Sequence, residues 1–167
     1  TYAGMKFLYN VWEDCGRADG FADCGQAAIR FDGNISGMTV HGNVFRRAGT
    51  CFFGAINVNG GRNNVIDSNR FEACPLAVST FFYPPWHWRK IFEGTDGNAR
   101  YVRDQTEGRI DIRRAPYATA YPRLRALRYE PQVNFITRNV SVGGVVDPGC
   151  PAPTALYGNA SIGEKAK

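Results

Sequence analysis

The sequence predicts an all-β solenoid, a parallel β-helix in which successive coils of the chain stack on one another. Three observations predict this fold class. A six-residue pattern built around asparagine recurs along the chain, a second strand-like pattern alternates with it, and short stretches rich in glycine and asparagine lie between them. Recurrence of this kind is the signature of repeat architectures.

The six-residue pattern reads apolar, variable, variable, asparagine, variable, aromatic. Its copies occupy residues 7–12, 40–45 and 66–71, and a fourth copy at 136–141 lacks the aromatic residue. The asparagines are Asn10, Asn43, Asn69 and Asn139, so the first two intervals are similar and the last is more than twice as long. The second pattern begins with alanine and an aliphatic residue, at 28–32, 55–59 and 77–81. A period in the mid-twenties with two short strands per repeat fits one coil of a parallel β-helix.

The asparagine column has a physical reason. At a bend between strands asparagine tolerates left-handed backbone geometry and its amide bonds to the backbone. In stacked coils, successive asparagine side chains also bond one another as a ladder. The aromatic residue two positions later points to the same side of an extended strand. If that side faces the interior, Trp12, Phe45 and Phe71 form a buried stack.

The spacings also predict how the chain is organised. We expect about four rungs, formed by residues 1–83 and by a last rung at 133–147. The long interval between Asn69 and Asn139 requires a long, partly helical insertion at 84–132, with a short helix expected at 122–128, where proline occupies a tolerated first-turn position. Residues 148–167 are expected to be a C-terminal tail.

Composition excludes several classes of function. Hydrophobic residues make up 44% of the chain, but no apolar run approaches the roughly 20 residues of a membrane span. The net charge is +5. Its arginine-rich segment is interrupted by Asp104, Glu107 and Asp111 and carries no nucleic-acid-binding motif, so no nucleic-acid partner is expected. The chain has no C-x-x-C pair and few clustered acids, so we expect no metal site and no cofactor.

The repeats resemble a known group. The resemblance lies in the segments at 28–32, 36–45, 60–66 and 69–74, and in those at 115–117, 121–124, 130–131 and 134–140. These segments are similar to the right-handed parallel β-helix repeat proteins of the pectate-lyase-like superfamily, closest to putative polysaccharide-degrading glycoside hydrolases of the α-fucosidase and xylanase types. The resemblance implies a right-handed coil, a glycan partner and Asp32 as a catalytic acid. It also implies a second Asp on an earlier coil than Asp32, at a position before Thr1.

Strand alternation predicts where a glycan would lie. Arg30 and Asp32 point to the side opposite Ile29 and Phe31. The matching positions of the following coils add polar side chains to one outward face, and the aromatic and imidazole side chains at the start of the insertion are candidates to stack on sugar rings. The predicted substrate-binding residues are Arg30, Asn57, Asn59, Ser79, Tyr83, Trp86, His87 and Trp88. The alternatives are that Asp32 is a surface carboxylate paired with Arg30 and that the aromatic residues anchor the insertion.

The function that we expect is glycan binding or glycoside hydrolysis on this outward face. The alternative is a non-catalytic assembly protein that docks on other protein chains through its open β-helix ends or its arginine-rich insertion. Three glycosylation sequons, at Asn34, Asn139 and Asn159, fit an extracellular, secreted protein or one in an organelle lumen. Cys51 and Cys74 are expected to be buried within rungs.

Overall fold

The computed structural model describes residues 4–16, 26–33, 35–81, 84, 86, 90, 114–122, 133–146 and 154–163. The chain divides into two compact units, one formed by Tyr2–Phe82 with Val133–Lys167 and the other by Tyr83–Gln132. All of the described strands belong to the first unit. In the second unit the described helix is α3, Tyr117–Ala120. Most of the helix predicted at 122–128 lies outside the described residues.

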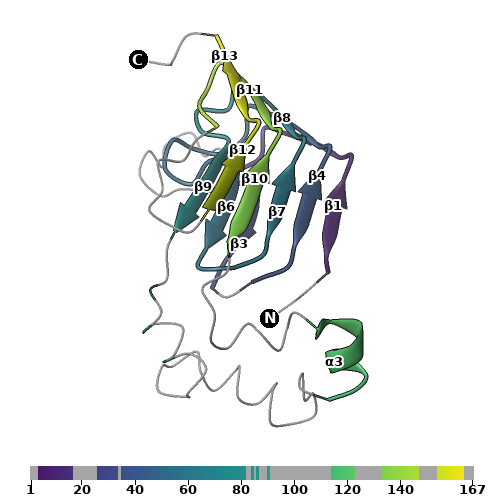
Figure 1. Ribbon diagram of the computed structural model, residues 1–167. Helices are drawn as coiled ribbons and strands as arrows, with labels where there is room; N and C mark the ends of the chain where they lie inside the picture. The colour runs from purple at the N-terminus through teal and green to yellow at the C-terminus, as the bar shows by residue number, and fades with distance from the viewer. Residues whose placement is uncertain are drawn as a thin grey trace. The chain divides into compact units, whose positions relative to one another are not determined.

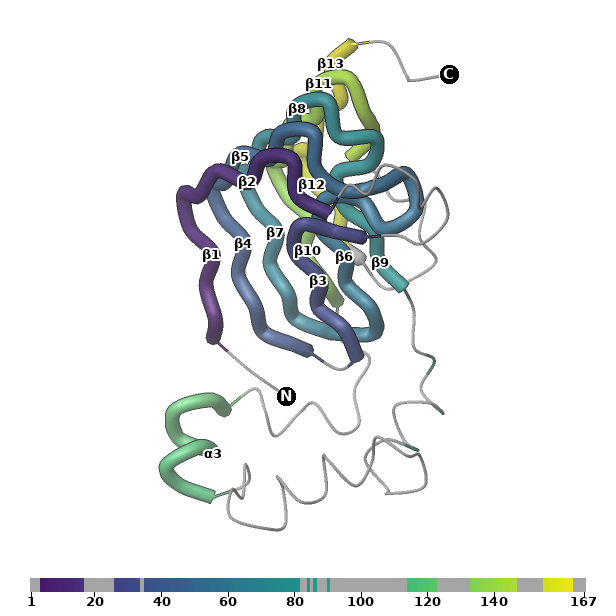
Figure 2. The backbone as a smooth tube through the Cα atoms, turned by 180° about the vertical axis from the view of Figure 1, so that it is seen from behind, coloured from purple at the N-terminus to yellow at the C-terminus, as the bar shows by residue number. Residues whose placement is uncertain are grey.

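The first unit is all-β, as predicted, and its strands form three parallel sheets (Figures 1 and 2). Sheet A contains β1 (Lys6–Leu8), β4 (Thr39–His41), β7 (Val65–Asp67), β10 (Asn134–Thr137) and β12 (Thr154–Tyr157). Sheet B contains β2 (Val11–Glu13), β5 (Val44–Arg46), β8 (Arg70–Glu72), β11 (Val140–Val142) and β13 (Ala160–Ile162). Sheet C contains β3 (Ile29–Phe31), β6 (Ile56–Asn59) and β9 (Val78–Phe81).

Each strand pairs with the equivalent strand one repeat later. In sheet A, Phe7 pairs with Val40, Val40 with Ile66 and Ile66 with Ile136. The six-residue pattern is therefore divided between two strands, one in sheet A and one in sheet B, so a repeat such as β4, β5 and β6 has three short strands and not the two that we expected. The left-handed residue at the bend is the one before the asparagine, as at Tyr9, Ser68 and Arg138, whose φ angles are 57°, 55° and 53°.

The asparagines form the predicted ladder. Asn43 donates its backbone N–H and its Nδ2 to Oδ1 of Asn69, at 2.9 and 3.0 Å. Asn69 makes the same two bonds to Asn139, and Asn139 makes them to Asn159. The Nδ2 of Asn69 also donates to the carbonyl oxygen of Val40, 3.0 Å away. The ladder thus satisfies backbone groups at a bend that is inside the fold, where an unpaired group would be costly.

The interior of the unit is apolar. Phe45 stacks on Phe71 with ring centroids 5.0 Å apart, and on Trp12 at 6.1 Å, which confirms the predicted aromatic stack. Aliphatic side chains from sheets A and C pack with this stack in the same core cluster. Cys74 is buried among them, whereas Cys51 is exposed, so the prediction of a buried side chain at Cys51 was wrong. Cys51 belongs to a turn after β5 rather than to a strand.

The predicted tail contains regular structure. β12 and β13 lie within residues 148–167 and add a fifth strand to sheets A and B. Asn159 continues the ladder between them. The prediction that the rungs end at residue 147 was therefore wrong. Residues 156–161 repeat the pattern of the copy at 136–141, with Ser161 in the place of Ser141, so the sequence did carry a signal for this last repeat.

Candidate functional site

The outer face of sheet C carries the polar residues that alternation predicts. Ile29 and Phe31 are buried in the core, while Arg30, between them, is exposed. In the register of the sheet, Arg30 pairs with Asn57 and Asn57 with Ser79. Asp32, just beyond the end of β3, is hydrogen-bonded to Asn59. Sheet C therefore brings five of the predicted residues together.

Asp32 is the exposed anion of this face. Its side chain is 58% exposed and lies 3.3 Å from Nη2 of Arg30. Oδ1 accepts hydrogen bonds from Nδ2 of Asn59 at 2.5 Å and from the backbone N–H of Gly33 at 2.9 Å. Partial burial raises the pKa of Asp32, but the hydrogen bonds from Asn59 and Gly33 and the charge of Arg30 lower it more, so its pKa lies below the usual value. Asp32 is thus suited to accept hydrogen bonds rather than to donate a proton at neutral pH.

Asn57 and Ser79 lie beneath the loop that precedes β6, which contains Phe52 and Phe53. Asn57 is 0% exposed, and its Nδ2 donates to Oγ of Ser79 at 2.7 Å. That hydroxyl in turn donates to the carbonyl oxygen of Phe53, also at 2.7 Å. The loop is closed by a hydrogen bond from the N–H of Gly54 to the carbonyl of Thr50. Asn57 and Ser79 therefore hold the loop on the sheet, and the solvent-facing part of the predicted face consists of Arg30, Asp32 and Asn59.

The loop supplies two aromatic rings, Phe52 and Phe53, that were not predicted to belong to this face. Phe52, Phe53 and Phe81 contact one another with centroid distances of 4.9 to 5.5 Å. Phe52 is 57% exposed. The guanidinium carbon of Arg30 lies 4.7 Å from the centroid of the Phe53 ring. An exposed ring, an ionised carboxylate, an amide and a guanidinium thus occupy one surface. Two adjacent phenylalanines in a turn that ends in glycine were the available signal.

The aromatic and imidazole residues predicted at the start of the insertion belong to the second compact unit. Of these, Trp86 is described; it is exposed, and Nζ of Lys90 lies 5.2 Å from its ring centroid. Tyr83, His87 and Trp88 lie outside the described residues. A role in substrate binding for Tyr83, Trp86, His87 and Trp88 stays a prediction.

A second carboxylate is the other requirement for glycoside hydrolysis, which uses a pair roughly 5 to 9.5 Å apart. Asp67 lies on β7 in sheet A, not in sheet C with Asp32. Asp19 and Asp23 lie outside the described residues. Among the described residues, sheet C therefore places no second carboxylate beside Asp32.

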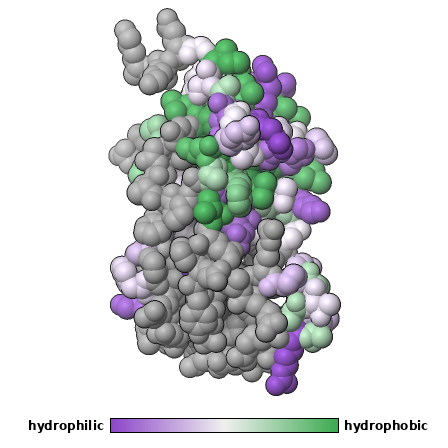
Figure 3. Space-filling view, viewed as in Figure 1, coloured by the Kyte–Doolittle hydropathy of each residue, from purple (hydrophilic) through white to green (hydrophobic). Residues whose placement is uncertain are grey.

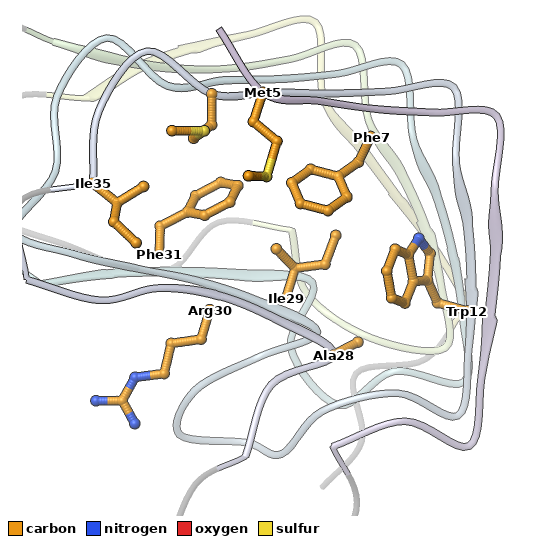
Figure 4. Close-up of a pocket in the computed structure, with 9 residues that line it drawn as sticks. Met5, Phe7, Trp12, Ala28, Ile29, Arg30, Phe31 and Ile35 are labelled. Atoms are coloured by element: carbon orange, nitrogen blue, oxygen red, sulfur yellow. The ribbon is translucent and has the colours of Figure 1, made fainter. Parts of the chain in front are cut away.

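An apolar pocket of about 260 Å³ opens beside the first strand of each sheet (Figure 4). Phe7, Trp12 and Phe31 project into it, while Arg30 points away. Nε1 of Trp12 is a buried donor with no hydrogen-bond partner among the described residues. This lining favours an apolar segment with a single acceptor over a sugar, whose hydroxyls need several polar partners.

One of the three glycosylation sequons, at Asn139, lies inside the asparagine ladder. Nδ2 of Asn139, the atom that glycosylation modifies, is buried and donates to Oδ1 of Asn159 and to the carbonyl of Ile66. A glycan at Asn139 is therefore incompatible with the folded ladder. Asn34 lies outside the described residues.

Among the described residues, no three histidine, cysteine or acidic side chains gather as a metal site requires. Within the same residues no helix is both long and apolar enough to cross a membrane. Comparisons of the chain with protein-family models, curated proteins and solved structures gave no match.

Proposed function

We propose that the first unit is a right-handed parallel β-helix that binds a glycan on the outer face of sheet C. Two features support the fold: parallel pairing of each strand with its equivalent one repeat later, and the strong preference of crossovers between parallel strands for the right hand. The resemblance of the repeats to carbohydrate-active β-helix proteins supports the ligand class.

The observation that carries the proposal is the exposed Phe52 ring on the same face as the ionised Asp32. A pyranose ring has an apolar face that packs on an aromatic ring. Its hydroxyls need both donors and acceptors at the rim. Arg30 supplies donors, Asp32 supplies acceptors and Asn59 supplies both. We propose binding rather than hydrolysis as the primary activity, because a carboxyl with a lowered pKa is a poor proton donor at neutral pH.

The test is binding of the whole chain to immobilised plant and algal glycans, followed by calorimetry with the strongest ligand. Phe52→Ala removes the exposed ring and should weaken binding about 10-fold. Asp32→Asn removes the charge and should weaken it by about 10-fold or more. Phe135→Ala, an exposed aromatic position on sheet A, is the matched control and should leave the affinity unchanged. Failure to retain any glycan, or equal affinity in the Phe52→Ala variant, would refute the proposal.

The apolar pocket favours a second candidate, assembly with another protein chain. β1, β2 and β3 each lie at one end of the strand order of their sheet, and no other strand among the described residues pairs with that edge. A β-strand segment that adds to these edges would cover Phe7 and Trp12 and could supply a carbonyl to the indole N–H. Sedimentation of the chain over a concentration series tests self-association, which a monomer at every concentration would contradict.

A further inference from the structure

The outer face of sheet A carries a cluster that the glycan proposal does not use. Leu8, His41 and Asp67 are in register on β1, β4 and β7, and Thr137 pairs with Asp67 from β10. Hydrophobic and hydrophilic residues are intermixed on the surface in view in Figure 3. Within the cluster the acidic side chain is buried, His41 and Arg138 contact it, and the ring of Tyr9 packs on His41.

Asp67 is held from three successive repeats. Its side chain is 7% exposed. Oδ1 accepts a hydrogen bond from Oγ1 of Thr137 at 2.6 Å, and Oδ2 accepts one from Nη2 of Arg138 at 2.7 Å and one from Ser68 at 3.1 Å. Burial raises the pKa of Asp67, but these hydrogen bonds and the one with His41 lower it to about 2. Asp67 is therefore an ionised, immobilised carboxylate.

His41 is oriented by that carboxylate. Its Nδ1 lies 2.8 Å from Oδ2 of Asp67. An ionised carboxylate is an acceptor only, so the proton between them belongs to Nδ1. In the neutral imidazole this leaves Nε2 with a lone pair. The side chain of His41 is 32% exposed, so solvent has access to the ring.

Tyr9 packs against the same imidazole. The two ring centroids are 5.4 Å apart and the ring planes meet at 85°. A Cβ atom at Gly42 would lie 2.5 Å from the Tyr9 ring, so the glycine leaves the space that the ring occupies. Tyr9 is largely exposed, and it takes the left-handed backbone geometry found before the ladder asparagine in the other repeats.

A cation lies close to the imidazole. Nδ1 of His41 and Nη2 of Arg138 both contact Oδ2 of Asp67, at 2.8 and 2.7 Å, so the two side chains are held against one carboxylate oxygen. The Arg138 side chain is 64% exposed and has further N–H donors beyond the one given to Asp67. An oxyanion that forms beside His41 would therefore have a positively charged donor within reach.

We propose that this cluster hydrolyses carboxylic esters, with His41 as the general base, Arg138 as the cation that stabilises the oxyanion and Asp67 as the positioning residue for His41. Water attacks the ester carbonyl carbon while its proton passes to Nε2 of His41, and the carbonyl π electrons move to the oxygen near Arg138. The bond to the alcohol then breaks, and Nε2 returns the proton to the leaving alkoxide. The products are a carboxylic acid and an alcohol, and His41 is neutral again.

The test uses the whole chain with p-nitrophenyl acetate and follows the release of p-nitrophenolate. The wild-type chain should hydrolyse the ester at least 10-fold faster than free imidazole at the same concentration. His41→Gln keeps a donor for Asp67 but removes the base, and should lower the rate about 100-fold. Arg138→Met should lower the rate about 10-fold, because it removes the cation that stabilises the oxyanion. Arg46→Met removes a matched exposed arginine, paired with Glu72 at 2.8 Å in sheet B, and should leave the rate unchanged.

Thermal unfolding of each variant separates chemistry from folding. The proposal expects His41→Gln to lose the activity while retaining its unfolding temperature within a few degrees. If the His41→Gln variant fails to fold, the Arg138→Met variant tests the proposal independently through its rate of ester hydrolysis. A wild-type rate no greater than that of imidazole, or a full rate in the His41→Gln variant, would overturn the proposal. Neither result tests the glycan-binding proposal, because that proposal concerns the outer face of sheet C and this cluster lies on sheet A.

Discussion

The backbone N–H of Asn69 donates to Oδ1 of Asn139 at 2.9 Å, although 70 residues of sequence separate the two. The same pair makes a second bond, from Nδ2 to Oδ1 at 3.0 Å. The insertion therefore enters the repeat without interrupting the ladder. A long excursion of the chain is tolerated here because the buried bend on each side of it retains all of its polar partners.

Replacement of Asn69 by alanine should destabilise the first unit strongly. Asn69 accepts from the backbone and the side chain of Asn43, and it donates to Val40 and Asn139. Its loss leaves buried groups without partners, at about 1–3 kcal/mol for each such group. We expect urea unfolding to show a loss of about 3 kcal/mol or more. Asn10→Ala, at the exposed first position of the ladder, is the control and should lose about 1 kcal/mol or less.

The sequence predicted the ladder and the aromatic stack because both depend on residues that recur in one order. Asparagine and an aromatic residue mark each copy, and parallel stacking then aligns Phe45 with Phe71. The sequence also indicated a bend at the asparagine, but it did not indicate that the left-handed residue is the one before it. The left-handed position before the asparagine is Tyr9 in one repeat, Gly42 in the next and Ser68 in the third. No single residue type therefore marks this position in the sequence.

The candidate site was predictable in part. Alternation along β3 correctly placed Arg30 and Asp32 on the outer face, because it follows from strand geometry alone. Alternation does not say what covers a face. Asn57 and Ser79 point outward as expected, yet they are buried, because the loop that carries Phe53 folds over them. That contact depends on tertiary structure, and so does the convergence of His41 and Asp67 from different repeats.

Stability at acid pH should depend on Asp67. Its pKa in the folded protein is about 2, below the usual 3.8. The unfolded chain therefore binds the proton more readily, so this carboxylate contributes stability above about pH 4 and loses the contribution as the pH falls toward 2. The shift corresponds to about 2 kcal/mol. Asp67→Asn should be less stable than the wild type by about that much at pH 7, and the difference should shrink at pH 2.5.

Urea unfolding of both proteins at several pH values measures this difference. Comparison of the two proteins at each pH removes the contribution of other carboxylates with lowered pKa values, such as Glu72. A difference in unfolding free energy that stays constant from pH 7 to 2.5 would contradict the assignment of the acid dependence to Asp67.

Cys51 and Cys74 should differ in reactivity. Cys51 is exposed, whereas Cys74 is buried and burial raises the pKa of its thiol. Alkylation proceeds through the thiolate and requires access. Brief iodoacetamide treatment of the native chain, followed by peptide mass spectrometry, should therefore label Cys51 and leave Cys74 unmodified. In urea both should be labelled to the same extent, and native labelling of Cys74 would show that the core around Phe45 opens.

Phe71 and Phe52 separate the stability of the fold from the proposed binding function. Phe71 is fully buried and stacks on Phe45 at 5.0 Å, so Phe71→Ala should lower the free energy of unfolding by about 3–5 kcal/mol. Phe52 is 57% exposed, so Phe52→Ala should change it by about 0.5 kcal/mol at most. Urea titrations with a common slope measure both effects. If Phe52→Ala also destabilised the unit by several kcal/mol, its loss of glycan affinity would reflect collapse of the loop over Asn57 and Ser79 rather than loss of a stacking ring.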